Sequence, residues 1–92
     1  MTDYSRLPRH MQDTARRYVE KGITGGSFFQ AVVSNDFKTA FAKADDENTA
    51  AMRDWAMWLY NDAPIGCQGS AESVKSWVDA GGLTGILKED AT

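Results

Sequence analysis

The chain contains one histidine and one cysteine, His10 and Cys67, the two side chains that could together form a nucleophile and its base. Such a pair also needs a group that orients the imidazole and donors that stabilise an oxyanion, and the residue spacing signals neither. His10 lies among polar residues on the expected solvent side of a helix, and Cys67 lies in a glycine-flanked loop where packing is favoured over reactivity. The sequence therefore predicts a protein that is not an enzyme, and it implies no cofactor.

Three consecutive carboxylates, Asp45, Asp46 and Glu47, invite a metal-binding interpretation. A calcium loop spreads its ligands over about 12 residues and closes with a glutamate, and this run does not follow that pattern. Adjacent carboxylates are also typical of a helix start, where they complement the helix dipole. We therefore expect capping residues and no metal site, and an acidic face that imitates phosphate is the interpretation left open.

A candidate anion site consists of residues that supply positive charge or free backbone N–H groups: Arg16, Arg17, Lys21, Gly25 and Gly26. Basic side chains near an aromatic ring often bind nucleotides, and glycines ahead of a helix leave N–H groups free for an anion. No strand signal precedes the glycines and no lysine follows them, as a phosphate loop would require. Ion pairs with Asp13 and Glu20 on a solvated helix face are the competing interpretation, and the sequence favours it.

The elements that position these residues are predicted to be helices, because apolar residues recur three and four positions apart. The expected helices lie near residues 8–21, 27–34, 36–43, 45–61 and 71–80. Pro8 suits a first helical turn and Gly22 suits a helix end. Asn35 is expected to end one helix and cap the next, with Asp36 in the first turn, and Ser70 is expected to cap the last helix.

The predicted fold is therefore all-α, a compact single domain (residues 1–92) of four to five short helices packed as a helical bundle. Its ordered core spans about residues 7–82. The sequence leaves open whether the tail, residues 83–92, docks on this core or stays mobile.

Length and charge exclude several classes of protein. Ninety-two residues leave room for one core, and a single cysteine excludes an internal disulfide. Residues 1–22 carry a balance of +2 and residues 23–92 one of −5, so the net charge of −3 repels phosphate and duplex DNA is not an expected partner. No apolar run approaches the roughly 20 residues that cross a bilayer, and the N-terminus lacks a secretory signal. We expect a cytoplasmic protein without membrane contact.

Ten residues are expected to be largely buried: Met11, Tyr18, Phe29, Val32, Phe41, Met52, Trp55, Leu59, Val74 and Trp77. Three indoles in so small a domain either all fit the core or place one ring at an interface. Helix 45–61 has a wide apolar face that includes Met57, Trp58 and Tyr60. This width predicts a homodimer built on the outer face of that helix. The alternatives are an open face for a host target and a face covered by the tail.

Four motifs occur in order along the chain: LPRHM at 7–11, RYVEKGITGGSF at 17–28, NDFKTAFAKAD at 35–45 and LYNDAPIGCQGS at 59–70. Over roughly residues 7–82 the chain thereby resembles a family of small proteins encoded by bacteriophages and prophages of Proteobacteria. It departs from the family pattern at Thr24-Gly25, where Pro-Gly is usual, and at Phe37, where Leu is usual. Small phage accessory proteins often act by binding, so the resemblance implies an interaction protein and no particular chemistry.

The resemblance and the surface pattern together predict a phage-type accessory protein in the cytoplasm of a bacterial host cell. We expect it to bind and inhibit a host or anti-phage defence protein. The expected partner surface combines acidic and apolar side chains: Asp45, Asp46, Glu47, Met57, Trp58 and Tyr60. The alternative is a protein that binds or sequesters a nucleotide or another anion at the candidate anion site. An enzyme that uses His10 or Cys67 ranks last.

Overall fold

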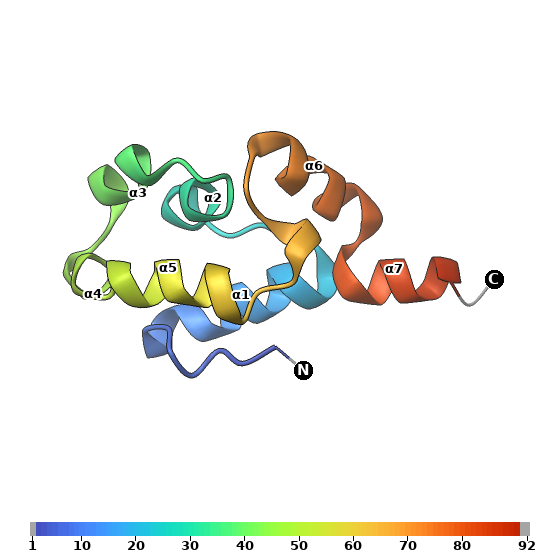
Figure 1. Ribbon diagram of the computed structural model, residues 1–92, viewed down its shortest axis with the longest axis horizontal. Coiled ribbons are helices and arrows are strands. Elements are labelled where there is room, and N and C mark those ends of the chain that lie inside the picture. Colours follow the sequence, from blue (N-terminus) through green and yellow to red (C-terminus); the bar gives the residue numbers. More distant parts are fainter. Residues whose placement is uncertain (1, 91–92) are drawn as a thin grey trace.

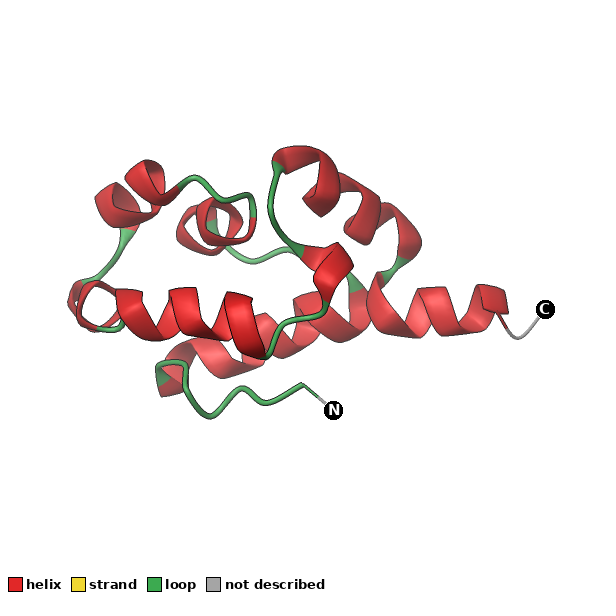
Figure 2. Ribbon diagram, in the orientation of Figure 1, coloured by secondary structure: helices red, strands yellow, loops and turns green. Residues whose placement is uncertain are grey.

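The computed structural model describes the backbone of residues 2–90 and the side chains of residues 2–87, and every regular element in that range is a helix (Figure 2). The elements are α1 (Arg9–Lys21), α2 (Ser27–Val33), α3 (Phe37–Lys43), α4 (Asp46–Ala50), α5 (Met52–Asn61), the 3-10 helix η1 (Ile65–Cys67), α6 (Ala71–Ala80) and α7 (Gly82–Asp90). The prediction of a small all-α domain is confirmed. The expected number of helices is too low, because one predicted helix is broken and the tail adds another.

Two of the predicted helices match closely because their end signals are satisfied. α1 follows Pro8 and ends at Gly22, which has a φ of 71° and donates its N–H to the Tyr18 carbonyl at 2.9 Å. α6 begins after Ser70, whose hydroxyl accepts a hydrogen bond from the Ser73 N–H at 3.1 Å. Local capping therefore sets these boundaries.

The cap of α3 is one residue later than expected. The Asp36 carboxylate accepts a hydrogen bond from the Thr39 N–H at 3.3 Å, so Asp36 is the cap and is not in the first turn. Asn35 has a φ of 63°, the left-handed conformation that asparagine tolerates better than most residues. Asn35 therefore ends α2, as expected, but it does not cap the next helix.

The predicted helix at 45–61 is broken at Ala51, which separates α4 from α5 (Figure 1). In a straight helix, residues 48 and 55 would be about 10.5 Å apart along the axis. The break brings the Asn48 Oδ1 within 3.0 Å of the Trp55 Nε1. This buried hydrogen bond favours the break, because a donor with no partner would be costly there.

The first part of the tail docks and forms α7. Figure 1 shows α7 beginning at the C-terminal end of α1 and extending along the long axis, which measures 44 Å. Leu83 and Ile86 pack against the core. The backbones of Gly22 and Gly82 lie so close together that a Cβ on Gly22 would be only 2.8 Å from the Gly82 amide nitrogen. Residues 91–92 lie outside the described range.

The core is organised around the Trp55 ring, which is fully buried. Its centroid lies 5.4 Å from that of Phe28, 5.9 Å from that of Phe29 and 6.0 Å from that of Trp58, each in an edge-to-face arrangement. Tyr18 extends the cluster through Phe29, with ring centroids 5.2 Å apart. Three of the helices, α1, α2 and α5, therefore share one aromatic core.

The expected core is correct for most of its members and wrong for three. Phe41 lies on the outer side of α3 and is 56% exposed. Met11 and Val74 are half-buried at the edge of the core. Trp58, which we expected on an outer face, is fully buried, because the segment before α1 covers it and its Nε1 donates to the Asp3 carbonyl at 2.9 Å.

Candidate functional site

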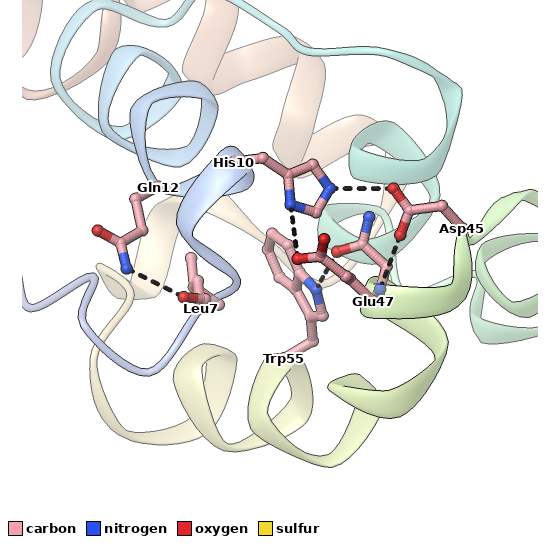
Figure 3. Close-up of polar contacts among 7 residues, drawn as sticks. Leu7, His10, Gln12, Asp45, Glu47 and Trp55 are labelled. Atoms are coloured by element: carbon pink, nitrogen blue, oxygen red, sulfur yellow. Dashed lines mark hydrogen bonds and ion pairs between the residues drawn. The ribbon is translucent and has the colours of Figure 1, made fainter.

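His10 holds the beginning of α1 against α4. Figure 3 shows its ring between the carboxylates of Asp45 and Glu47. The His10 Nε2 lies 3.0 Å from the Asp45 Oδ2, and the Nδ1 lies 3.4 Å from the Glu47 Oε2. A neutral imidazole has one N–H, so only the protonated ring can donate to both carboxylates. His10 is exposed, as expected, but it has specific partners that the sequence did not indicate.

The acidic run caps α4, as predicted. The Asp45 Oδ1 accepts a hydrogen bond from the Asn48 N–H at 2.8 Å, and Asp46 and Glu47 occupy the first turn. The Asn48 N–H and then the His10 imidazole lower the pKa of the Asp45 carboxyl below its usual value of 3.8. Among residues 2–87, no three histidine, cysteine or acidic side chains are grouped so that they could hold a metal ion.

Cys67 is fully buried and lies far from His10. The Tyr18 hydroxyl donates to the Cys67 carbonyl at 2.6 Å, and residues 10 and 18 are about 12 Å apart along α1. Burial raises the pKa of the Cys67 thiol to about 12, so the reactive thiolate is scarce at neutral pH. The fold therefore separates the two residues that a thiol–imidazole pair would need, and a buried packing role describes Cys67.

The candidate anion site is not assembled as predicted. Arg17 pairs with Asp13 at 2.9 Å, and Arg16 lies 3.8 Å from the same carboxylate. The Arg16 guanidinium also lies over the Tyr4 ring, 5.2 Å from its centroid. Lys21 is exposed at the other end of the helix. The competing interpretation of a solvated face with ion pairs therefore describes both arginines.

Of the two glycines of that site, Gly25 packs closely against α1, whereas a Cβ on Gly26 would meet no other atom within 4 Å. A Cβ on Gly25 would lie 2.4 Å from the Thr14 Cγ2, so a side chain there would collide with α1. Gly26 precedes α2, and no side chain caps that helix. Close packing against Thr14 is the reason for Gly25.

The structure also divides the expected partner surface. Asp45, Asp46 and Glu47 are exposed around α4, whereas Tyr60 is exposed at the far end of α5 (Figure 1). Between them, Met57 is half-buried and Trp58 is fully buried. These six residues therefore form no continuous surface.

All three indole N–H groups have partners inside the chain. Besides the bonds of Trp55 and Trp58, the Trp77 Nε1 donates to the Tyr18 carbonyl at 2.9 Å. The three rings are buried. Of the two alternatives for the tryptophans, intramolecular burial is correct.

Among the surface depressions formed by the described residues, two combine features of a binding site, and the sequence predicted neither. The first, which we call the Asn48 pocket, has a volume of about 310 Å³ and a polar wall of His10, Thr14, Ser27, Lys43, Asp45 and Asn48. The second, which we call the Tyr60 groove, has a volume of about 230 Å³ and is lined by Asn35, Phe37, Ala56, Leu59, Tyr60 and Gln68. Each of these two depressions is lined by residues from elements that are distant in sequence, so no local motif could predict it.

Large apolar side chains are exposed at the end of α5 and in the segment that follows it. Tyr60 is 86% exposed, and Ile65, five residues later in η1, is 94% exposed. Ile65 was not among the predicted site residues, because a lone isoleucine in a loop has no periodicity to show which way it points. The groove and these two side chains leave apolar area exposed at this end of the chain's α5–η1 segment.

No protein-family model matches this chain, and comparison with curated proteins and with solved structures likewise finds no match. None of the helices described is long and apolar enough to cross a membrane.

Proposed function

We propose that this chain is a phage- or prophage-type accessory protein that binds and inhibits a host or anti-phage defence protein in the bacterial cytoplasm, without being an enzyme. The proposed contact surface is the Tyr60 groove together with the exposed Ile65 side chain, which follows Tyr60 by five residues in sequence. The observation that carries this proposal is the exposure of Tyr60 and Ile65, at 86% and 94%. Tyrosine and large apolar residues next to a depression are typical of the centre of a protein interface.

The motif that carries the phage resemblance supports the choice of this surface. Residues 59–70 include Leu59, Tyr60 and Cys67. Leu59 and Cys67 are buried, so packing explains them, whereas Tyr60 points away from the core. A contact with another molecule would explain Tyr60 in the same motif.

Charge indicates the kind of partner. Residues 23–92, which supply the whole groove, carry a balance of −5, and Asp36 lies between the groove residues Asn35 and Phe37 in sequence. Complementary charge accelerates association and selects the partner. We therefore expect a protein surface that inserts an apolar side chain into the groove and surrounds it with basic residues.

Capture from a bacterial host lysate with matched variants tests the proposal. Tyr60→Ala and Ile65→Asp should lose a protein that the wild type retains, because interface centres lose about 2 kcal/mol or more when an anchor is removed. Ile23→Asp is the matched control, since Ile23 is also exposed but lies at the end of α1. After purification of the captured protein, the two groove variants should bind it about 30-fold more weakly than the control.

Two results would contradict the proposal. One is a set of captured proteins that is identical for the wild type, the groove variants and Ile23→Asp. The other is a purified partner that binds Ile65→Asp as tightly as the wild type. Either result would show that the exposed side chains at the end of α5 do not mediate binding.

A second copy of the chain is the alternative occupant of this region. The predicted homodimer used the outer face of residues 45–61, where Trp58 is not available but Met57 and Tyr60 are at least partly exposed. Light scattering at micromolar concentration decides the matter. A mass near 10.1 kDa at every dilution would exclude the dimer, and a doubled mass that Tyr60→Ala halves would establish it at the groove.

A further inference from the structure

The Asn48 pocket lies at the opposite end of the α4–α5 segment from the Tyr60 groove, between α1, α2 and the end of α3. Its volume of about 310 Å³ is large enough for a small polar ligand. Its floor includes Phe28 and Phe29, which belong to the aromatic core. A rigid floor of this kind keeps the polar wall in place.

Asn48 is the central residue of this pocket, because it is polar and only 3% exposed. The Trp55 indole N–H can only donate, so the Asn48 amide oxygen must face it, and the two atoms are 3.0 Å apart. The Asn48 Nδ2 consequently points away from Trp55, and no residue between 2 and 87 accepts a hydrogen bond from it. Since no enclosed side-chain nitrogen or oxygen in that range lacks a partner, this Nδ2 must open to the pocket that Asn48 lines.

The other open positions on the wall are also donors. Lys43 forms no ion pair with a described carboxylate, and the hydroxyls of Thr14 and Ser27 form no hydrogen bond with a described residue. The one carboxylate on the wall, Asp45, already has both oxygens occupied, by the Asn48 N–H at 2.8 Å and the His10 Nε2 at 3.0 Å. The unused hydrogen-bonding capacity of the pocket is therefore an amide, an ammonium and two hydroxyls.

We propose that the Asn48 pocket binds a small oxyanion, a phosphate ester or a carboxylate, through the Asn48 Nδ2 and the Lys43 ammonium. An oxyanion supplies several acceptors at once, and hydrogen bonds to a charged group are stronger than neutral ones. The Lys43 ammonium supplies the positive charge for the ligand, and the two Asp45 oxygens are already occupied by the Asn48 N–H and the His10 Nε2. This site is independent of the proposed protein contact, and of the residues in the candidate anion site it includes Gly26 but none of the three basic residues.

NMR titration of the ¹⁵N-labelled full chain tests the site, because Asn48 links the pocket to the Trp55 indole. Inorganic phosphate and acetate serve as separate probes. Binding at the Nδ2 should polarise the Asn48 amide and shift its side-chain NH₂ resonances together with the Trp55 indole N–H, in a saturable manner at millimolar concentration. Saturation by phosphate alone identifies a phosphate ester as the ligand class, and saturation by acetate alone identifies a carboxylate.

Two variants and one matched control make the test specific. Lys43→Gln removes the charge from an exposed position and should weaken binding about tenfold, whereas Lys38→Gln, on the same helix but outside the pocket, should bind like the wild type. Asn48→Asp keeps an acceptor for the Trp55 indole but replaces the open donor with a carboxylate, so binding should be lost. The chemical shift of the Trp55 indole N–H shows whether Asn48→Asp remains folded. If Asn48→Asp does not fold, the affinity of Lys43→Gln for the probes tests the site.

The proposal is overturned if neither probe produces a saturable shift of the Asn48 and Trp55 resonances in the wild type. It is also overturned if Lys43→Gln binds either probe as tightly as Lys38→Gln does, because the anion would then lie elsewhere.

Discussion

The two ends of the α4–α5 segment differ in the kind of group that has no partner within the chain. At the α4 end, the Asn48 pocket has open hydrogen-bond donors beside a polar residue that is only 3% exposed. At the α5 end, the Tyr60 groove has open apolar area, with Tyr60 86% exposed. The first kind of surface selects a small polar ligand, and the second selects a protein with an apolar side chain. Both ends are held by the same aromatic core around Trp55.

The largest effect expected from this comparison distinguishes two neighbouring aromatic residues of α5. Trp58→Glu buries an unpaired charge in a fully buried position and removes the indole bond to Asp3, so the chain should unfold. Tyr60→Glu changes an exposed side chain and should alter the free energy of unfolding by less than about 0.5 kcal/mol. Circular dichroism with thermal unfolding measures both. If the Trp58→Glu protein remained folded, the side chain at position 58 would not belong to the core.

A smaller effect separates the polar anchors of the two ends. Asn48→Ala leaves the buried Trp55 N–H without its acceptor at 3.0 Å and should lower the free energy of unfolding by about 1–3 kcal/mol. Gln68→Ala removes a half-buried hydrogen bond to the Leu59 carbonyl, and the smaller cost expected is about 0.5–1.5 kcal/mol. Urea denaturation compares the two variants. Equal losses in the free energy of unfolding would mean that the Gln68 hydrogen bond at the groove stabilises the fold as much as the Asn48 hydrogen bond at the pocket.

The smallest effect concerns acid pH and the α4 end alone. The pKa of Asp45 is lowered in the folded chain by the Asn48 N–H and the His10 imidazole. A lowered pKa contributes stability that is present above the unfolded value near 3.8 and is lost as the pH falls through the folded value. Asp45→Asn keeps a capping oxygen and should flatten the decline in stability below about pH 4.

Thermal unfolding of the wild type and Asp45→Asn between pH 2 and 7 measures this difference. Asp46→Asn is the control, since Asp46 lies in the same turn but accepts none of the side-chain hydrogen bonds described for Asp45. Identical pH profiles for the wild type and Asp45→Asn would show that ionisation of the Asp45 carboxyl does not contribute to the pH dependence of stability.

The comparison also shows why the candidate sites were harder to predict than the helices. The six residues expected to form a partner surface share a sequence window from 45 to 60, but the break at Ala51 and the burial of Trp58 separate them. Lys43 and Ser27, by contrast, are distant in sequence from His10 and meet it at one pocket. Periodicity places a residue on a helix face, and it does not say which face another segment covers.

The sequence alone determined the helical class, most helix ends and most of the core, because these depend on interactions between residues a few positions apart. The left-handed Gly22, the Ser70 cap and the apolar spacing around Trp55 are examples. The tertiary structure alone decided that α4 and α5 separate, that the tail packs as α7 and that Phe41 stays exposed while Trp58 does not. Those outcomes depend on contacts between distant segments, such as the Asp3 carbonyl that accepts the Trp58 indole bond, and such contacts exist only after the chain has folded.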